Sequence, residues 1–402
     1  MSLFHRARSQ GTYAAIVEIG SGSVVVAILA SDPTQPMPRI IWSQRELAPL
    51  RNIDALEETI RTILTALTTA AMAFDQSGRA ALRAHDPAGR IGVVKYSISA
   101  PWAYTITKRV GTTAEHPFLV SETLVEELTA TARTRVQEEL EHNDQLMPLA
   151  LRDVAEYVLA EYANEYHITD PIGQQAESFH LAIAHVITPQ RLREAITQVH
   201  DSIAAQKPQQ ISSSMLNFDA ARITLLPNHT ETCLVEVTYE ATEIGIVRDG
   251  ILRFCTHTPF GSYSLAREIA AITDVPLHEA FGYLHAPQPF AFLDDQTNKT
   301  KQALEALFDS YVARLHELFN QTGDELSIPR RIILHTDQTS EPFFTELIEK
   351  AVKRTIKSSP HITPITSIVQ RQWQRHNTPE QTDDTALLLS AYVFHKDRAE
   401  HS

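Results

Sequence analysis

Cysteine, glycine and long apolar runs are all scarce in this sequence. Its 402 residues include 2 cysteines and 13 glycines. With so few cysteines and no recognisable secretory leader, we expect a protein of the reducing cytoplasm in which Cys233 and Cys255 are thiols rather than a disulfide. No stretch approaches the roughly 20 apolar residues that cross a bilayer, so contact with a membrane is predicted to be indirect or peripheral.

The short motifs of several large enzyme classes are missing as well. The sequence has no Walker phosphate loop, no Gly-x-Gly-x-x-Gly fingerprint and no Cys-x-x-Cys pair. It has no nucleophile elbow and no convincing set of metal ligands, so we predict no catalytic and no metal-binding residues. A formal net charge of -14 argues against general nucleic-acid binding, which requires a basic surface.

What the sequence does contain is enough apolar material for a substantial core. Hydrophobic residues make up 43% of the chain and charged residues 21%, as in an ordinary globular protein. At this length we expect two or three domains.

Three short strands in succession organise the second half of the chain. Residues 234–237 have the pattern of a buried strand and residues 242–247 that of a second. Asp249-Gly250 is a tight-turn signal that leads into a third strand over residues 251–258. This pattern predicts an antiparallel three-stranded unit, followed by a helix that Ser262 or Ser264 caps.

A similar unit occurs near the start of the chain. Val17-Glu18-Ile19 precedes a turn of small residues, Gly20-Ser21-Gly22-Ser23, and a strand over residues 24–30. Each half therefore opens with a strand, an acidic residue, a turn and a strand. A unit repeated about two hundred residues apart predicts two similar domains that face each other, because solenoid repeats recur every 20 to 50 residues or so.

The order of these segments resembles the actin-like ATPase superfamily and, within it, the bacterial FtsA/PilM family. Residues 17–23 look like the family's first phosphate loop and residues 235–250 like its second. Residues 166–173, with the strand over 181–188, are similar to the inserted subdomain that FtsA and PilM share. The resemblance implies an α/β actin-like ATPase fold, with two ribonuclease-H-like domains around a cleft and an FtsA-type inserted subdomain.

The same resemblance implies how the chain is divided. Residues 1–103 and 201–227 are expected to form the first actin-like domain, and residues 104–200 the inserted subdomain. Residues 228–402 are expected to form the second domain, with a trimmed small subdomain near residues 284–327.

Two patterns concern segments outside the repeated unit. Residues 52–74 carry apolar side chains at helical spacing, which predicts a helix that packs on the core. The following residues, 75–89, are polar and rich in Ala and Arg, and we interpret them as a loop.

Nucleotide binding in this family depends on backbone amides in three loops, where glycines let the chain approach phosphate closely. The resemblance implies ATP and magnesium as cofactors, with Glu18 positioning metal-bound water. The corresponding residues here are Glu18, Gly20, Ser21, Gly22 and Ser23 in the first loop, Glu236, Thr238, Tyr239, Glu240, Thr242 and Glu243 in the second, Gly261 after it, and Thr336 and Asp337 in the adenosine loop.

Two of the three loops depart from the family pattern. Thr238, Tyr239 and Glu240 stand where the second loop has glycines, and His335 and Asp337 lie where the adenosine loop has them. An unpaired Glu240 carboxylate about 4 Å from a phosphate would cost on the order of 4 kcal/mol at an effective dielectric of 20. We therefore predict that ATP binding is lost or severely weakened; the alternative is that the side chains point outward and the site still forms.

The functional hypothesis is a cytoplasmic scaffold or adaptor with a degenerate ATP site, not an enzyme, that acts through protein–protein contacts. The resemblance implies partners from the division or the pilus machinery, and self-association, with cell division favoured. Two alternatives stay open: a PilM-like adaptor of type IV pilus assembly, and an FtsA-like protein that still binds and hydrolyses ATP.

Overall fold

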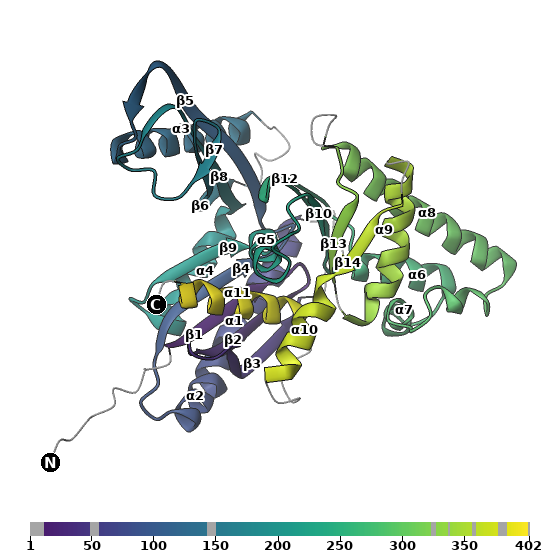
Figure 1. Ribbon diagram of the computed structural model, residues 1–402. Helices are drawn as coiled ribbons and strands as arrows, with labels where there is room; N and C mark the ends of the chain where they lie inside the picture. The colour runs from purple at the N-terminus through teal and green to yellow at the C-terminus, as the bar shows by residue number, and fades with distance from the viewer. Residues whose placement is uncertain are drawn as a thin grey trace.

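The computed structural model describes residues 12–48, 56–142, 150–322, 327–336, 338–355, 359–376 and 384–400. Within these residues the chain forms two five-stranded sheets and one four-stranded sheet (Figure 1). The four-stranded sheet belongs to a subdomain that projects at the upper left of Figure 1, and the second five-stranded sheet lies to the right.

The first five-stranded sheet has the order β3-β2-β1-β4-β9. Its strands are β1 (Thr12–Ile19), β2 (Ser23–Ser31), β3 (Arg39–Leu47), β4 (Ile91–Ile98) and β9 (Gln209–Ser213). The three strands β1, β2 and β3 are antiparallel, whereas β4 and β9 run parallel to β1. Strand β2 is buried along almost its whole length because helices cover both faces of the sheet.

Four helices cover this sheet in two layers. Helices α1 (Leu56–Ala73) and α4 (Gln190–Ala204) contact each other on one face. Helices α5 (Ser214–Leu225) and α11 (Thr385–Glu400) contact each other on the opposite face. Throughout the described ranges, no helix combines the length and the apolar character needed to cross a membrane.

The segment predicted as a loop over residues 75–89 is largely helical, so that prediction was wrong. A π-helical turn, Phe74–Gly78, leads directly into helix α2 (Arg79–His85). The side chains of Phe74 and Leu82 are buried, and Phe74 packs edge-on against Trp42. Alanine and arginine are good helix formers, so a few buried apolar contacts are enough to keep this polar segment helical.

The second five-stranded sheet has the order β12-β11-β10-β13-β14. Its strands are β10 (Thr232–Val237), β11 (Thr242–Arg248), β12 (Ile251–Thr258), β13 (Arg331–His335) and β14 (His361–Pro364). Strand for strand, the order and directions match the first sheet, with β10 in the place of β1. The three antiparallel strands and the internal repeat predicted from the sequence are therefore present.

Helices pack around the second sheet. They are α6 (Ser262–Thr273), α7 (Leu277–Leu284), α8 (Asn298–Asn320), α9 (Glu341–Thr355) and α10 (Ile365–His376), with the short turns η3 (Ala291–Leu293) and η4 (Gln338–Ser340). Helix α6 begins after Gly261, which caps it without any side-chain hydrogen bond, so the predicted serine cap was wrong. A Cβ atom at position 261 would lie 2.2 Å from the carbonyl oxygen of Thr238, which explains why glycine stands there.

The four-stranded sheet, with the order β5-β8-β6-β7, forms the inserted subdomain. It consists of β5 (Tyr104–Leu119), β6 (Leu151–Ala163), β7 (Tyr166–Ile168) and β8 (Gln175–Pro189), all antiparallel, with helix α3 (Glu122–Glu141) on one face. Ser121 caps α3 through a hydrogen bond from the amide of Leu124. On its other side the subdomain contacts β12, where Arg253 donates a hydrogen bond to Tyr162.

Both cysteines are free thiols. Cys233 lies opposite Ile246 and Cys255 opposite Gly245, which are successive residues of β11. Because successive residues of a strand point to opposite faces, the two thiols lie on different sides of the sheet.

Candidate functional site

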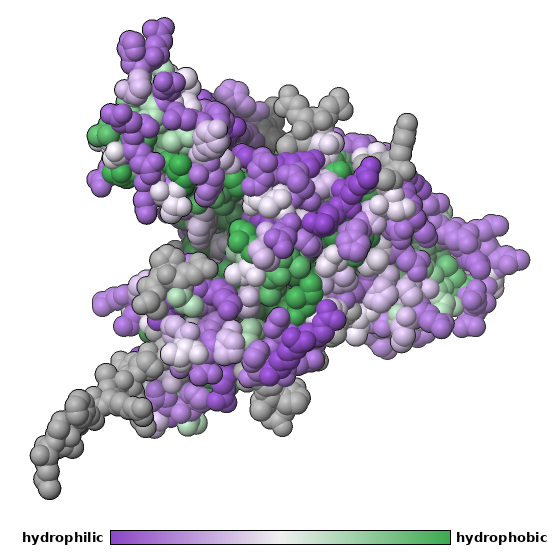
Figure 2. All heavy atoms as spheres, viewed as in Figure 1, coloured by the Kyte–Doolittle hydropathy of each residue, from purple (hydrophilic) through white to green (hydrophobic). Residues whose placement is uncertain are grey.

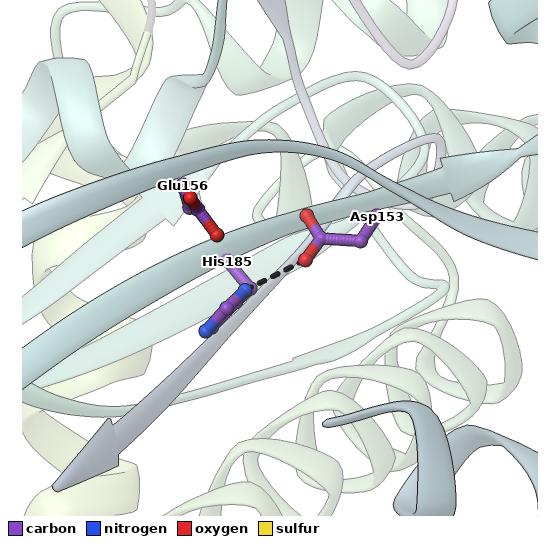
Figure 3. Close-up of side chains that lie close together, drawn as sticks. All are labelled: Asp153, Glu156 and His185. Carbon is purple, nitrogen blue, oxygen red and sulfur yellow. Dashed lines mark hydrogen bonds and ion pairs between the residues drawn. The ribbon is translucent and has the colours of Figure 1, made fainter. Parts of the chain in front are cut away.

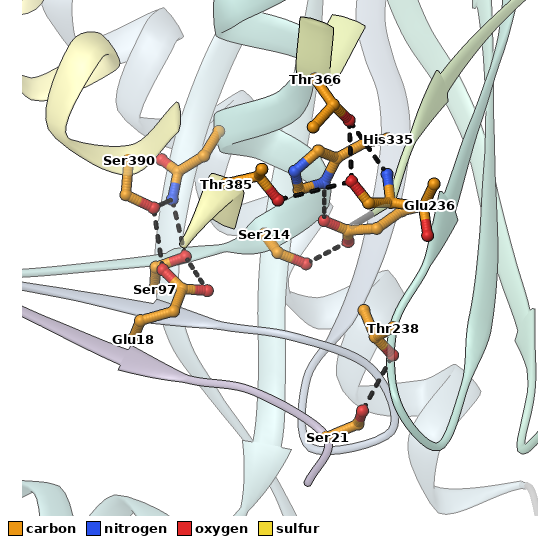
Figure 4. A network of polar contacts seen from close by, with 12 residues as sticks. Glu18, Ser21, Ser97, Ser214, Glu236, Thr238, His335, Thr366, Thr385 and Ser390 are labelled. Carbon is orange, nitrogen blue, oxygen red and sulfur yellow. Dashed lines mark hydrogen bonds and ion pairs between the residues drawn. The ribbon is translucent and has the colours of Figure 1, made fainter. Parts of the chain in front are cut away.

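The two turns that the sequence assigns to phosphate binding meet across the cleft between the five-stranded sheets (Figure 4). Ser21, in the β1–β2 turn, donates a 2.9 Å hydrogen bond to the hydroxyl of Thr238, in the β10–β11 turn. The Ser21 hydroxyl also accepts a 2.8 Å hydrogen bond from the amide of Glu240. The two turns thus bind each other directly, and one backbone amide of the second turn donates its hydrogen bond to the first.

Tyr239 occupies the space above the first turn. A Cβ atom on Gly22 would lie 3.1 Å from the Cβ atom of Tyr239, so the two residues are in close contact. The Tyr239 hydroxyl accepts a 3.0 Å hydrogen bond from Arg45 on β3, and Arg45 is ion-paired with Asp384 beside α11. Tyr239 therefore links the second domain to the first.

The Glu240 side chain differs from the sequence prediction, which placed an unpaired carboxylate near the phosphate path. Arg267 donates two hydrogen bonds of 2.6 Å to this carboxylate, and Ser264 donates one of 2.7 Å. The side chain is only 2% exposed and is held by α6. Because Arg267 neutralises the charge locally, the electrostatic cost estimated from the sequence does not apply.

The space left in this cleft is small. The cavity measures about 60 Å³ and is bounded by both turns, Arg45, His335 and the start of α11. Pockets that hold organic ligands typically enclose about 300–1,000 Å³. Direct contacts between the turns, together with the Tyr239 ring, thus bound a cavity much smaller than such pockets.

Two buried acids stand at corresponding positions in the repeat. Glu18, near the end of β1, accepts hydrogen bonds from Ser97 at 3.1 Å and from Ser390 at 2.9 Å (Figure 4). Glu236, near the end of β10, accepts hydrogen bonds from Ser214 at 2.5 Å and from His335 at 2.9 Å. Side chains of the protein thus satisfy both carboxyl groups.

Burial sets the protonation of Glu18. Burial raises the pKa of Glu18 from 4.5 to about 8, against the lowering effect of hydrogen bonds from Ser390 and Ser97, while the charges of Asp384 and Glu236 raise it further. At neutral pH this carboxyl group is mostly protonated. A neutral acid whose oxygens already accept two hydrogen bonds is poorly suited to orient magnesium-bound water. With a cavity this small and this acid neutral, the residues present do not fit ATP and magnesium in this arrangement.

The sequence-predicted site residues fall into two groups. Those that line the cavity are Glu18, Gly20, Ser21, Ser23, Glu236, Thr238, Tyr239 and Thr336. Those that lie behind it, or against its wall, are Gly22, Glu240, Thr242, Glu243 and Gly261. Asp337 lies outside the described residues.

Two of the residues behind the cavity have structural partners that the sequence did not suggest. The Thr242 hydroxyl donates to the carbonyl oxygen of Phe260 and lies 2.9 Å from the hydroxyl of Tyr311. Glu243 faces Glu236 across the β10–β11 pair, and burial, with the Glu236 charge, raises the pKa of Glu243 well above its usual value.

Sequence reasoning missed the residues that close the cleft. Arg45 and Asp384 are far apart in the chain, and Arg267 lies on α6, a helix for which the sequence predicted only a serine cap. The sequence contains no signal for such pairs, because only the docking of the two domains brings these side chains together.

A larger hollow lies between the inserted subdomain and the first domain (Figure 2). This β6–β9 groove, as we call it, encloses about 710 Å³ and is lined by residues 154–159 of β6, residues 209–212 of β9, one face of α5 and the end of α11. Every successive residue of the two strand segments lines it. The groove therefore faces the edges of both strands.

Within the described residues neither edge has a strand partner along this groove, although the Tyr157 hydroxyl on β6 donates a hydrogen bond to the carbonyl oxygen of Ile211 on β9. Strand β9 pairs with β4 alone, and β6 pairs with β8 on one side and with β7 only from Glu161 onward. Unpaired edges present free N–H and C=O groups to a neighbour. Apolar side chains flank these edges, among them Val158, which is 50% exposed, and Ile223, which is 51% exposed.

A second polar cluster lies in the inserted subdomain (Figure 3). The register of β6 against β8 shifts between Asp153 and Ala155, which brings Asp153 and Glu156 to the same face as His185. One ligand atom of each of these three residues lies within 4.8 Å of the others. His185 pairs with Asp153 at 2.7 Å and Arg133 donates to Glu156 at 2.7 Å.

These are ligand types that zinc accepts. However, Arg133 neutralises Glu156, and Asp153 is already hydrogen-bonded to His185. We assign the cluster a structural role in holding α3 to the sheet. Sequence reasoning missed it because the bulge that gathers the three side chains has no sequence signature.

No protein-family model matches this sequence, and no curated protein matches it either. Solved structures do match it over nearly the whole chain. The PilM-PilN type IV pilus biogenesis complex aligns with a TM-score of 0.61 at 10% identity, covering 95% of this chain and 98% of the other.

Two further structures align more loosely. The ethanolamine utilization protein EutJ from Carboxydothermus hydrogenoformans aligns with a TM-score of 0.42 at 10% identity, covering 95% of this chain and 89% of the other. A Bacteroides thetaiotaomicron protein of unknown function with an actin-like ATPase fold aligns with a TM-score of 0.41 at 11% identity, covering 94% of this chain and 96% of the other. The similarity to the PilM-PilN complex, together with two five-stranded sheets of the same order and directions, shows the actin-like ATPase fold that the sequence predicts.

Proposed function

We propose that this chain is an adaptor of the PilM type that holds an extended segment of a partner protein in the β6–β9 groove. The observation that carries the proposal is the contrast between two hollows of the same molecule. The groove measures about 710 Å³, whereas the nucleotide cleft measures about 60 Å³. The groove has room for a peptide segment, whereas the cleft does not.

The groove has the features of a site that recognises an extended peptide. An added strand would displace the Tyr157 hydroxyl from the carbonyl oxygen of Ile211 and pair with the edge of β9 or β6, and alternate side chains would then point into the groove. Main-chain hydrogen bonds would supply affinity, and the apolar wall formed by Val158, Tyr157 and Ile223 would supply selectivity. A partner segment of about four to six residues matches the length of β9.

In this proposal the degenerate nucleotide site acts as an interdomain clamp. The bonds of Ser21 to Thr238 and of Arg45 to Tyr239 join the domains at the place where a bound nucleotide joins them in an ATPase of this fold. The chain would then need no ATP to bring its two domains together. Calorimetric titration with magnesium-ATP tests this, and we expect no binding at micromolar concentrations.

The similarity to PilM favours the pilus-type context over cell division as the first to be tested. PilM is solved together with PilN in a type IV pilus biogenesis complex. By analogy, the partner would be a protein that brings this chain to the inner face of the cell membrane. The FtsA-like division scaffold predicted from the sequence uses the same fold and is the second candidate.

A peptide selection tests the groove directly. Random peptides displayed on phage would be selected on the wild-type protein and then titrated against two variants. Ala220→Trp fills the groove from α5 without changing its charge, and Ala88→Trp makes the same substitution on an exposed turn outside it.

We expect selected peptides to bind wild type and Ala88→Trp alike and to lose at least tenfold affinity for Ala220→Trp. Equal binding to all three proteins, or no selection at all, would overturn the proposal.

A further inference from the structure

A lysine lies at the floor of the groove. Lys95 is on β4, directly beside Gln210 of the edge strand β9. Its side chain lines the groove and is only 7% exposed. Over the described part of the chain, its ammonium group makes no hydrogen bond and no ion pair.

An ammonium group in this position is energetically unusual. Removing most of the water around an unpaired charge is unfavourable unless an opposite charge or hydrogen bonds compensate it. Burial lowers the pKa of Lys95 to about 8, against the opposing charges of Asp397 and Glu18, so the group is mostly charged at pH 7. Asp397 lies at the exposed end of α11, and Glu18 is mostly protonated.

We propose that Lys95 is the anchor for an acidic side chain of the extended partner segment that occupies the β6–β9 groove. This inference rests on the proposed function and specifies the chemistry of the partner. The carboxylate would supply the charge and the hydrogen bonds that the Lys95 ammonium lacks.

The sheet geometry makes such a contact reachable. Lys95 and Gln210 are register partners, so their side chains point to the same face of the sheet. A residue opposite Gln210 on an added strand would point there too. The backbone of this residue would lie two strand spacings, or about 9.5 Å, from the backbone of Lys95. The extended side chains of a lysine and a glutamate together span a similar length.

The other charged groups at the groove do not take this role. Glu156 is ion-paired with Arg133, and Asp219 with Arg222. Lys396 and Asp397 lie together near the end of α11, so the rim carries both signs of charge. Lys95 is thus the buried cation that faces into the groove without a partner among the described residues.

The experiment combines the phage selection with Lys95→Met, which keeps the length of the side chain and removes its charge. Lys299→Met, on the exposed start of α8, is the matched control. We expect peptides selected on the wild type to share a Glu or Asp at one position. Charged hydrogen bonds contribute roughly 1.5–3 kcal/mol, so changing this acid to its amide should weaken binding about 10- to 100-fold.

Lys95→Met should weaken binding of the acidic peptide by a similar factor, and the amide peptide should then bind the variant and the wild type alike. Lys299→Met should have no effect. Thermal unfolding checks that Lys95→Met is folded, and we expect it to be at least as stable as the wild type because an unpaired buried charge is removed.

The outcomes separate the two proposals. If peptides are selected and Ala220→Trp blocks them, but they share no acid or bind Lys95→Met unchanged, the role of Lys95 is refuted and the groove stands. If Ala220→Trp fails to weaken any selected peptide, the groove itself is refuted.

Discussion

The protonation of Glu18 gives a prediction that can be worked out from the structure. Glu18 is buried near the end of β1, and it accepts hydrogen bonds from Ser97 and Ser390. Glutamine has the same shape, can accept from one hydroxyl and can donate to the other. Glu18→Gln therefore mimics the protonated acid, and we expect it to fold with the wild-type structure.

The expected pH dependence follows from the raised pKa. Burial raises the pKa of Glu18 from 4.5 to about 8 in the folded protein. Between these values the folded state binds a proton that the unfolded state has released. The stability this group contributes is fully present below pH 4.5 or so and is lost as the pH rises through about 8. For one group with this shift, the loss between pH 5.5 and 8.5 is roughly 3 kcal/mol.

Urea unfolding of wild type and Glu18→Gln at several pH values measures this contribution. The difference in unfolding free energy between the two proteins should change by about 3 kcal/mol from pH 5.5 to 8.5, because other titrating groups cancel in the comparison. Glu305→Gln on the exposed face of α8 is the control and should leave the pH dependence unchanged. A parallel pH dependence for wild type and Glu18→Gln would refute the reasoning, because it would show that Glu18 is ionised in the folded protein.

Substitutions at three other positions test the closed cleft. Arg267→Met leaves the Glu240 carboxylate buried without its cation, and we expect thermal denaturation to show that the free energy of unfolding falls by about 3–5 kcal/mol. Gly261→Ala would force a methyl group to 2.2 Å from the carbonyl oxygen of Thr238, so chemical denaturation should show that the free energy of unfolding falls by at least about 2 kcal/mol. Tyr239→Gly should gain weak magnesium-ATP binding in calorimetry, whereas Tyr239→Phe should gain none; equal results for the two would show that the ring does not block the cleft.

The repeated strand unit could be predicted because its signals are local. Alternating and continuous apolar runs identify strands, and Asp249-Gly250 identifies a tight turn whose two residues both have positive φ in the structure. Similar local patterns at residues 17–30 revealed the duplication. The order of both sheets then follows from the resemblance that these segments carry.

The state of the candidate site could not be predicted in the same way. From the sequence, Glu240 looked like an unpaired charge, because nothing in the sequence indicates that Arg267 on the following helix, α6, donates hydrogen bonds to it. Nor does the sequence show that Arg45 meets Tyr239 and Asp384, since those contacts depend on how whole domains dock. The stretch at residues 75–89 was misjudged for a related reason, because its polar composition does not reveal that Phe74 and Leu82 are buried against the rest of the domain.

The closed cleft and the open groove are connected through the first domain. Strand β4 carries Ser97, which holds Glu18 at the cleft, and Lys95, which lies in the groove, only two residues away. Helix α5 likewise bonds Glu236 through Ser214 and lines the groove through Ala220 and Ile223. If side-chain contacts replace the nucleotide, both elements are fixed before any partner arrives. A preformed groove avoids the ordering cost that a ligand-dependent groove must meet at each binding event, so in the proposed adaptor these side-chain contacts would favour binding of the partner segment.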